Sequence, residues 1–218
     1  MRLIGMLDSP YVRRVAISLD LLGIAFQHES ISVFSTFAQF SAINPVVKAP
    51  SLVCDDGVVL MDSSLILQFV EASAGRSLWS APPALLAHEF RAVGLALAAC
   101  EKSAQIVYER NLRPKEAQHE PWVERVSGQL LAAYDALEQQ VLCDPAVFAD
   151  PAKQPALSAA VAWGFTQAML PALVPAANHP GLVALAHRLE QTAPFLKYPA
   201  AGPGVSGQLI ARRDAGRA

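Results

Sequence analysis

The beginning of the chain decides its fold, because residues 3–31 read LIGMLDSPYVRRVAISLDLLGIAFQHESI. The apolar run at residues 3–7 predicts a buried strand. Ser9 and Pro10 are typical of an N-cap and a first helical position, so a helix of about a dozen residues should follow them. Residues 26–31 then predict a second strand. A strand, a helix and a strand in this order predict a βαβ unit with parallel strands.

The same α/β pattern continues to about residue 76. Residues 37–43 predict a short helix. Strands at residues 51–54 and 58–61 flank Asp55-Asp56-Gly57, a strong hairpin signal. A third helix should open at Asp62-Ser63. We therefore expect the order β-α-β-α-β-β-α, which forms one layered α/β domain.

Beyond residue 80 the strand signals stop. Apolar residues recur every three or four positions from Leu86 to Val107, and the pattern returns after Pro121. Further helices are predicted at residues 156–170 and 181–192. This pattern predicts an all-helical bundle.

The chain therefore divides into two expected domains, α/β and then all-α. Residues 1–76 form the first, and residues 84–205 form the helical second. Residues 77–83 are the expected linker and residues 206–218 the expected tail.

Composition restricts the classes of function. Hydrophobic residues make up 53% of the chain and charged residues 17%, which suits a buried core. The net charge of −2 lacks the basic footprint of a nucleic-acid-binding domain. The uncharged stretch at residues 157–177 contains polar residues and prolines, so we interpret it as a buried core helix and not as a membrane span. No secretory signal pattern is found, and we expect a cytoplasmic protein.

Metal and disulfide chemistry are not indicated. Cys54, Cys100 and Cys143 are widely spaced, with no CxxC pair, and are interpreted as free, mostly buried thiols in a reducing compartment. The five histidines form no i,i+4 pair, so we expect no metal site.

Three features of the first domain indicate a binding site for an anionic ligand. Ser9 lies at a helix N-terminus, where its hydroxyl either caps the helix or donates to an anion. Pro50 either begins a strand or forms a cis peptide that turns the backbone of Ala49 toward a ligand. Asp62 and Ser63 either cap a helix or bind an ammonium and a carboxylate group.

These segments together resemble the glutathione-binding landmarks of glutathione S-transferases. The residues concerned are Ser9-Pro10-Tyr11-Val12-Arg13-Arg14, Asn44-Pro45-Val46-Val47-Lys48-Ala49-Pro50 and Asp62-Ser63. The first of them is most similar to bacterial cytosolic members whose first helix opens Ser-Pro-Phe/Tyr-Val-Arg. The resemblance covers essentially the whole chain. It implies a thioredoxin-like N-terminal domain, an all-helical C-terminal bundle, a homodimer and a role in detoxification.

The resemblance also implies roles for individual residues. Ser9 would activate the thiol of glutathione, and Ala49, before a cis Pro50, would pair its backbone with the cysteinyl part. Asp62 and Ser63 would hold the γ-glutamyl ammonium and carboxylate. The other implied residues are Phe34 and Lys48 for glutathione, and Tyr11, Phe34 and Tyr108 for a hydrophobic electrophile.

The expected function is therefore a glutathione transferase with glutathione as co-substrate. The alternative is a non-catalytic interaction protein, similar to relatives that bind RNA polymerase. A thiol–disulfide reductase is disfavoured because Ser9 stands where a redox nucleophile would be cysteine. We expect no nucleic-acid or membrane partner.

Overall fold

A computed structural model describes residues 1–202 of the protein, which divide into two compact units. The first unit combines Met1–Trp79 with the segment that begins at Gln191, and the second is Ser80–Glu190. The sequence assigned residues 84–205 to one helical domain, whereas the segment from Gln191 packs with the α/β unit. The tail expected at residues 206–218 lies outside the described residues.

The first unit is built on a four-stranded sheet in the order β2-β1-β3-β4. Strands β1 and β2 are parallel, and β3 runs antiparallel to both β1 and β4. The predicted β-α-β-α-β-β-α order and the thioredoxin-like domain are confirmed. The elements are β1 (Arg2–Ile4), α1 (Pro10–Leu21), β2 (Gln27–Glu29), α2 (Phe37–Ile43), β3 (Ser51–Val53), β4 (Val59–Leu60), α3 (Ser63–Ala74) and α8 (Ala193–Lys197).

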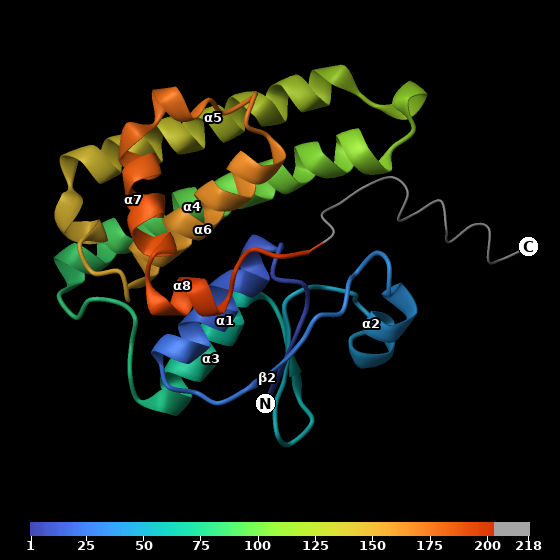
Figure 1. The fold of residues 1–218 in the computed structure, drawn as a ribbon, viewed down its shortest axis with the longest axis vertical. Helices are drawn as coiled ribbons and strands as arrows, with labels where there is room; N and C mark the ends of the chain where they lie inside the picture. The colour runs from blue at the N-terminus through green and yellow to red at the C-terminus, as the bar shows by residue number, and fades with distance from the viewer. Residues whose placement is uncertain (203–218) are drawn as a thin grey trace, which may run out of the picture. The chain divides into compact units, whose positions relative to one another are not determined.

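Alternation along the strands gives the sheet two apolar faces. Leu3 and Leu52 pack in one cluster with residues of α1 and α3, the two helices that lie side by side in Figure 1. Ile4 and Val53, the next residues along the same strands, pack with Phe40 of α2. The sheet therefore separates two cores, and α1 and α3 share one of them.

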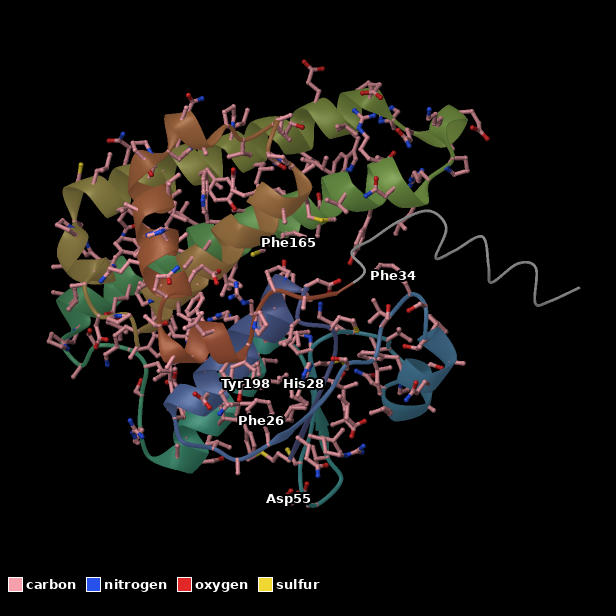
Figure 2. All side chains as sticks on the ribbon, viewed as in Figure 1. Phe26, His28, Phe34, Asp55, Phe165 and Tyr198 are labelled. Atoms are coloured by element: carbon pink, nitrogen blue, oxygen red, sulfur yellow. The ribbon has the colours of Figure 1, made fainter. Side chains whose placement is uncertain are left out.

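Helix α1 is covered on its outer side by the end of the described chain. Arg13 is only 2% exposed, and its Nε donates a hydrogen bond of 2.8 Å to the Tyr198 carbonyl. Its guanidinium carbon lies 4.9 Å from the centroid of the Phe195 ring. The ring of Tyr198 stacks on Phe26 with centroids 5.8 Å apart (Figure 2). These contacts explain why the segment from Gln191 belongs to the first unit.

The second unit is entirely helical among its described residues, as expected. Its long helices α4 and α5 pack along each other, and α6 packs against α4 and α7 (Figure 1). Residues 154–163 of α6 are all buried, which confirms the interpretation as a core helix. The elements are α4 (Pro83–Leu112), η1 (Lys115–Ala117), α5 (Glu120–Cys143), η2 (Pro145–Phe148), α6 (Gln154–Met169), η3 (Ala176–Asn178) and α7 (Pro180–Glu190).

Within residues 1–202, α4 is the one helix long and apolar enough to cross a membrane by length and composition. One such helix is weak evidence, because core helices of soluble proteins have the same composition.

Candidate functional site

The register of the sheet brings the three predicted segments to one end of it. Ile4, at the end of β1, pairs with Ser51, at the beginning of β3. Leu60, at the end of β4, pairs with Leu52. The segments that hold Ser9, Ala49 and Asp62 therefore all leave or enter the sheet at the same end of its strands.

Ser9 occupies the N-cap position of α1, with Pro10 at the first helical position, as predicted. The side chain of Ser9 makes no capping hydrogen bond, although its backbone carbonyl accepts from the Arg13 N–H at 3.0 Å. The residue is half-buried, and its hydroxyl bonds to no other group within residues 1–202. Ser9 therefore acts as N-cap through its backbone carbonyl and not through its side chain. Its hydroxyl remains available to a ligand.

Gly5 is a residue of this site that the sequence did not reveal. Its φ is +139°, and a Cβ atom there would lie 2.6 Å from Cγ2 of Val12 and 3.3 Å from Cβ of Ala49. His28 on β2 holds the Gly5 carbonyl through Nε2 at 2.8 Å (Figure 2). Only glycine lets α1, β1 and the Ala49 segment approach this closely. The signal available in the sequence was an isolated glycine inside a strand pattern.

The segment before β3 is fixed by Asn44, a second residue that the sequence did not single out. Asn44 is buried, and its Nδ2 donates to the Ser51 hydroxyl at 2.8 Å. Ser51 in turn donates to the Lys48 carbonyl at 2.8 Å. The Ala49–Pro50 peptide bond is cis, as the resemblance implied. These hydrogen bonds connect Lys48 and Ser51, the residues on either side of Ala49 and Pro50, while the Lys48 side chain is exposed.

The N-terminus of α3 carries Asp62 as its N-cap. A single oxygen of Asp62, Oδ1, accepts from the backbone N–H groups of Ser64 at 2.9 Å and Leu65 at 3.3 Å. One oxygen of this carboxylate therefore caps α3, and the expected contact with an ammonium group stays a prediction. Within the described part of the chain Oδ2 accepts no hydrogen bond, and Asp62 is exposed. Ser63, the first residue of α3, is buried.

The residues expected to contact a hydrophobic electrophile lie in different units. Tyr11 is the second residue of α1, and Phe34 lies in the segment between β2 and α2 (Figure 2); both are half-buried. Tyr108 belongs to α4 of the helical unit and is 43% exposed. Their common role as pocket walls stays a prediction.

The three cysteines lie outside the segments that hold Ser9, Ala49 and Asp62. Of the three cysteines only Cys100 is buried, and the expectation of mostly buried thiols is wrong for the exposed Cys143. Burial, followed by the negative charges of Asp56 and Asp55, raises the pKa of the Cys54 thiol. Among the described residues, no group of three or more histidines, cysteines and carboxylates is placed to hold a metal ion.

Comparison with known proteins connects this site to one family. Residues 3–78 match the glutathione S-transferase N-terminal domain. The uncharacterized GST-like protein YibF of Escherichia coli K12 is 32% identical over 71 residues. These residues are 33% of this chain and 35% of the relative, so the match spans about a third of each protein.

Solved structures match over most of the chain. A glutathione transferase family member from Pseudomonas fluorescens Pf-5, with bound glutathione, is 26% identical with a TM-score of 0.77 and covers 92% of this chain and 99% of that one. A glutathione S-transferase from Methylobacterium radiotolerans, in complex with glutathione sulfonate, has a TM-score of 0.80 at 24% identity and covers 92% and 95%. Residues 3–78 therefore match the glutathione S-transferase N-terminal domain, and the described chain shares the fold of these solved structures.

Proposed function

We propose that the protein is a glutathione transferase that adds the thiolate of glutathione to a hydrophobic electrophile. The observation that carries this proposal is the hydroxyl of Ser9, which sits at a helix N-terminus without serving as its cap. The glutathione-bound relative from Pseudomonas fluorescens, similar in fold and 26% identical, supports glutathione as the co-substrate.

We assign the binding of glutathione to the residues that the sequence resemblance implies. The backbone of Ala49, before Pro50, pairs with the cysteinyl part of glutathione. Asp62 holds the γ-glutamyl ammonium through Oδ2, since Oδ1 is used as a cap. Ser63 takes the γ-glutamyl carboxylate. Phe34 and the exposed ammonium of Lys48 are the remaining residues assigned to glutathione. Tyr11, Phe34 and Tyr108 are assigned to the hydrophobic electrophile.

The chemistry rests on stabilising an anion. A cysteine thiol has a pKa near ~8.5, and the thiolate is its reactive form. Lowering that pKa by two units takes roughly 2.7 kcal/mol. One hydrogen bond to a charged acceptor contributes about 1.5–3 kcal/mol, and a helix N-terminus adds about 0.3–1 kcal/mol. The sum of these contributions spans the required amount, so Ser9 and the dipole of α1 can lower the pKa of the thiol by two units without a general base.

The decisive experiment compares the wild type with Ser9→Ala. The pKa of the bound thiol, followed by ultraviolet titration, should rise in the variant, and the rate with an electrophile should fall roughly tenfold to hundredfold. Glutathione affinity should change little, because most binding contacts lie away from sulfur. Ser9→Thr, which keeps a hydroxyl, is the matched control and should retain most of the rate.

Two other results would change this assignment. Equal thiol pKa values in the wild type and Ser9→Ala would reduce Ser9 to a structural residue. If the wild type binds glutathione but converts no electrophile in a broad screen, the interaction protein becomes the better description. The first check is thermal: millimolar glutathione should raise the melting temperature, because the ligand binds only the folded state.

We further propose that the protein is a cytoplasmic homodimer. Exposed apolar side chains occur in both units, as expected of surfaces that another copy covers. They include Val46 at 63%, Leu65 at 58% and Phe69 at 41% in the first unit, and Phe90 of α4 at 54% in the second. Light scattering at micromolar concentration should give twice the chain mass of 23.3 kDa. A monomeric mass would contradict this proposal.

A further inference from the structure

The loop that joins β1 to Ser9 is anchored to β2 at its first residue. Gly5, which opens this loop, donates its N–H to the Glu29 carbonyl at 3.0 Å. The carbonyl of Gly5 accepts a hydrogen bond of 2.8 Å from Nε2 of His28, a half-buried residue of β2. At the other end of the loop, the Ser9 N–H donates to the Met6 carbonyl at 3.1 Å. The position of Ser9 therefore depends on a short loop whose first peptide is held from an edge strand of the sheet.

His28 replaces a hydrogen bond that the backbone of the sheet does not make. If the parallel ladder between β1 and β2 continued, the Gly5 carbonyl would accept from the N–H of Ile31. That N–H instead donates to the Glu29 carbonyl at 2.9 Å, since the chain leaves the ladder after the end of β2. The imidazole thus supplies the donor that the backbone no longer offers.

Gly5 needs such an anchor because its own conformation does not fix the loop. Its φ of +139° lies in a region open to glycine, the residue with the greatest backbone freedom. Gly5 also lies between the two segments that the proposed function uses to place the thiol. A Cβ atom there would approach Val12 of α1 on one side and Ala49 on the other. A rotation of the Gly5 peptide would therefore shift Ser9 relative to Ala49.

The imidazole of His28 acts in this contact as a donor and not as a base. A carbonyl oxygen only accepts hydrogen bonds, so Nε2 carries the proton that lies between His28 and Gly5. Both the neutral ring with its proton on Nε2 and the imidazolium can donate in this way. The contribution of His28 therefore comes from the place of its donor and not from its charge.

We propose that His28 is a positioning residue for thiol activation. Its bond to the Gly5 carbonyl holds the loop that places the Ser9 hydroxyl against the sulfur of a ligand bound at Ala49. This inference rests on the proposed function, in which Ser9 stabilises the thiolate of glutathione. It goes further because it gives a role in the reaction to a residue of β2, outside the three segments identified from the sequence.

The test compares three substitutions of His28 in the full chain. His28→Gln keeps an amide N–H near the place of Nε2, His28→Asn keeps one near the place of Nδ1, and His28→Ala keeps neither. Ultraviolet titration of bound glutathione should show that the pKa of the thiol rises by about one pH unit in His28→Ala and His28→Asn. The rate with 1-chloro-2,4-dinitrobenzene at saturating glutathione should fall about tenfold, because a misplaced hydroxyl activates the thiol poorly. His28→Gln should retain most of both properties, and the dissociation constant of glutathione should change less than about twofold in all three.

A double substitution determines whether His28 acts through Ser9. In Ser9→Ala the hydroxyl that the loop positions is absent, so the addition of His28→Ala should change the rate less than about twofold. Two residues that contribute independently would instead give effects that multiply. The double variant therefore separates positioning of Ser9 from any other effect of His28.

Glu29→Gln is the matched control on the same strand. The Glu29 carboxylate pairs with Arg2 at 2.8 Å, so this substitution weakens a contact between β1 and β2 and leaves the Gly5 carbonyl bonded to His28. The thiol pKa should stay at the wild-type value.

Three results would overturn the proposal while leaving the proposed function in place. They are a wild-type thiol pKa in His28→Ala, equal behaviour of His28→Gln and His28→Asn, and effects that multiply in the double variant. A wild type that does not bind glutathione would remove the proposed function itself, and this inference with it.

Discussion

The N-termini of α1 and α3 lie at the same end of the strands of the sheet. Both helices are 12 residues long, and both begin after a polar cap residue. The two caps are nevertheless used differently. The Ser9 hydroxyl makes no bond to the N–H groups of α1, whereas the Asp62 carboxylate accepts two from α3. A cap position in a sequence therefore says where a helix begins but not whether its side chain is available to a ligand.

The difference also separates two kinds of charge recognition. The first turn of α1 contains no acidic residue, so no side chain of that turn offsets the positive potential of the helix end. At α3 the cap itself is negative and Arg14 stands behind the next residue. The two helix ends therefore differ in the charge of their cap residues, neutral at α1 and negative at α3.

Among these substitutions Gly5→Ala should cause the largest loss in the free energy of unfolding, because it disturbs packing against α1 and leaves the N-terminus of α3 unchanged. The new Cβ would lie 2.6 Å from Cγ2 of Val12, a buried β-branched side chain with little freedom to move. Overpacking and a φ of +139° together should cost about 4 kcal/mol of the free energy of unfolding. Chemical denaturation followed by circular dichroism measures this loss.

Gly57→Ala is the matched control for that change. Gly57 also has a positive φ, +89°, but no atom lies within 4 Å of the position of its Cβ. Backbone strain alone should cost about 1 kcal/mol. Equal losses in the two variants would mean that the close approach of Val12 and Ala49 to Gly5 has no energetic importance.

Asp62→Ala should cause an intermediate loss in the free energy of unfolding, because it removes the cap of α3 alone. Removing the two capping hydrogen bonds should lower the free energy of unfolding by about 1 kcal/mol. Asp62→Asn keeps a capping oxygen and should recover most of this stability, while it still weakens glutathione binding because the negative charge is lost. If Asp62→Asn binds glutathione as tightly as the wild type, the carboxylate is a cap and nothing more.

Ser9→Ala should have the smallest effect on stability, below about 0.5 kcal/mol, because its hydroxyl caps nothing. This small loss is the counterpart of the large catalytic effect expected of the same substitution. A loss near 1 kcal/mol in the denaturation curve, similar to that of Asp62→Ala, would show that the two helix ends are alike after all.

Local patterns predicted the elements because their determinants are local. Ser9 and Pro10 fixed the start of α1, and Asp55-Asp56-Gly57 marked the turn between β3 and β4. The candidate site was also readable in outline, since its residues follow strands or open helices. Each of these signals, a helix cap or a turn, depends only on residues that are adjacent in the chain.

The remaining features depend on contacts between distant residues. Arg13 and Arg14 are charged and would be assigned to the solvent side of α1, yet their partners lie 185 and 49 residues away and both are buried. The tight approach around Gly5 requires the positions of three elements at once. Periodicity and composition do not encode contacts between distant residues. The contacts of Arg13, Arg14 and Gly5 are therefore known only from the folded structure.

The contacts of Arg13 with the end of the chain have a consequence for synthesis of the protein. The ribosome makes Met1–Trp79 first, but the segment from Gln191 that completes the same unit comes after roughly 110 further residues. At about 5–20 residues per second, this interval is on the order of ten seconds. During it the nascent α/β unit exposes the outer side of α1 that Phe195 and Tyr198 later cover, so the first domain to emerge is the last to be completed.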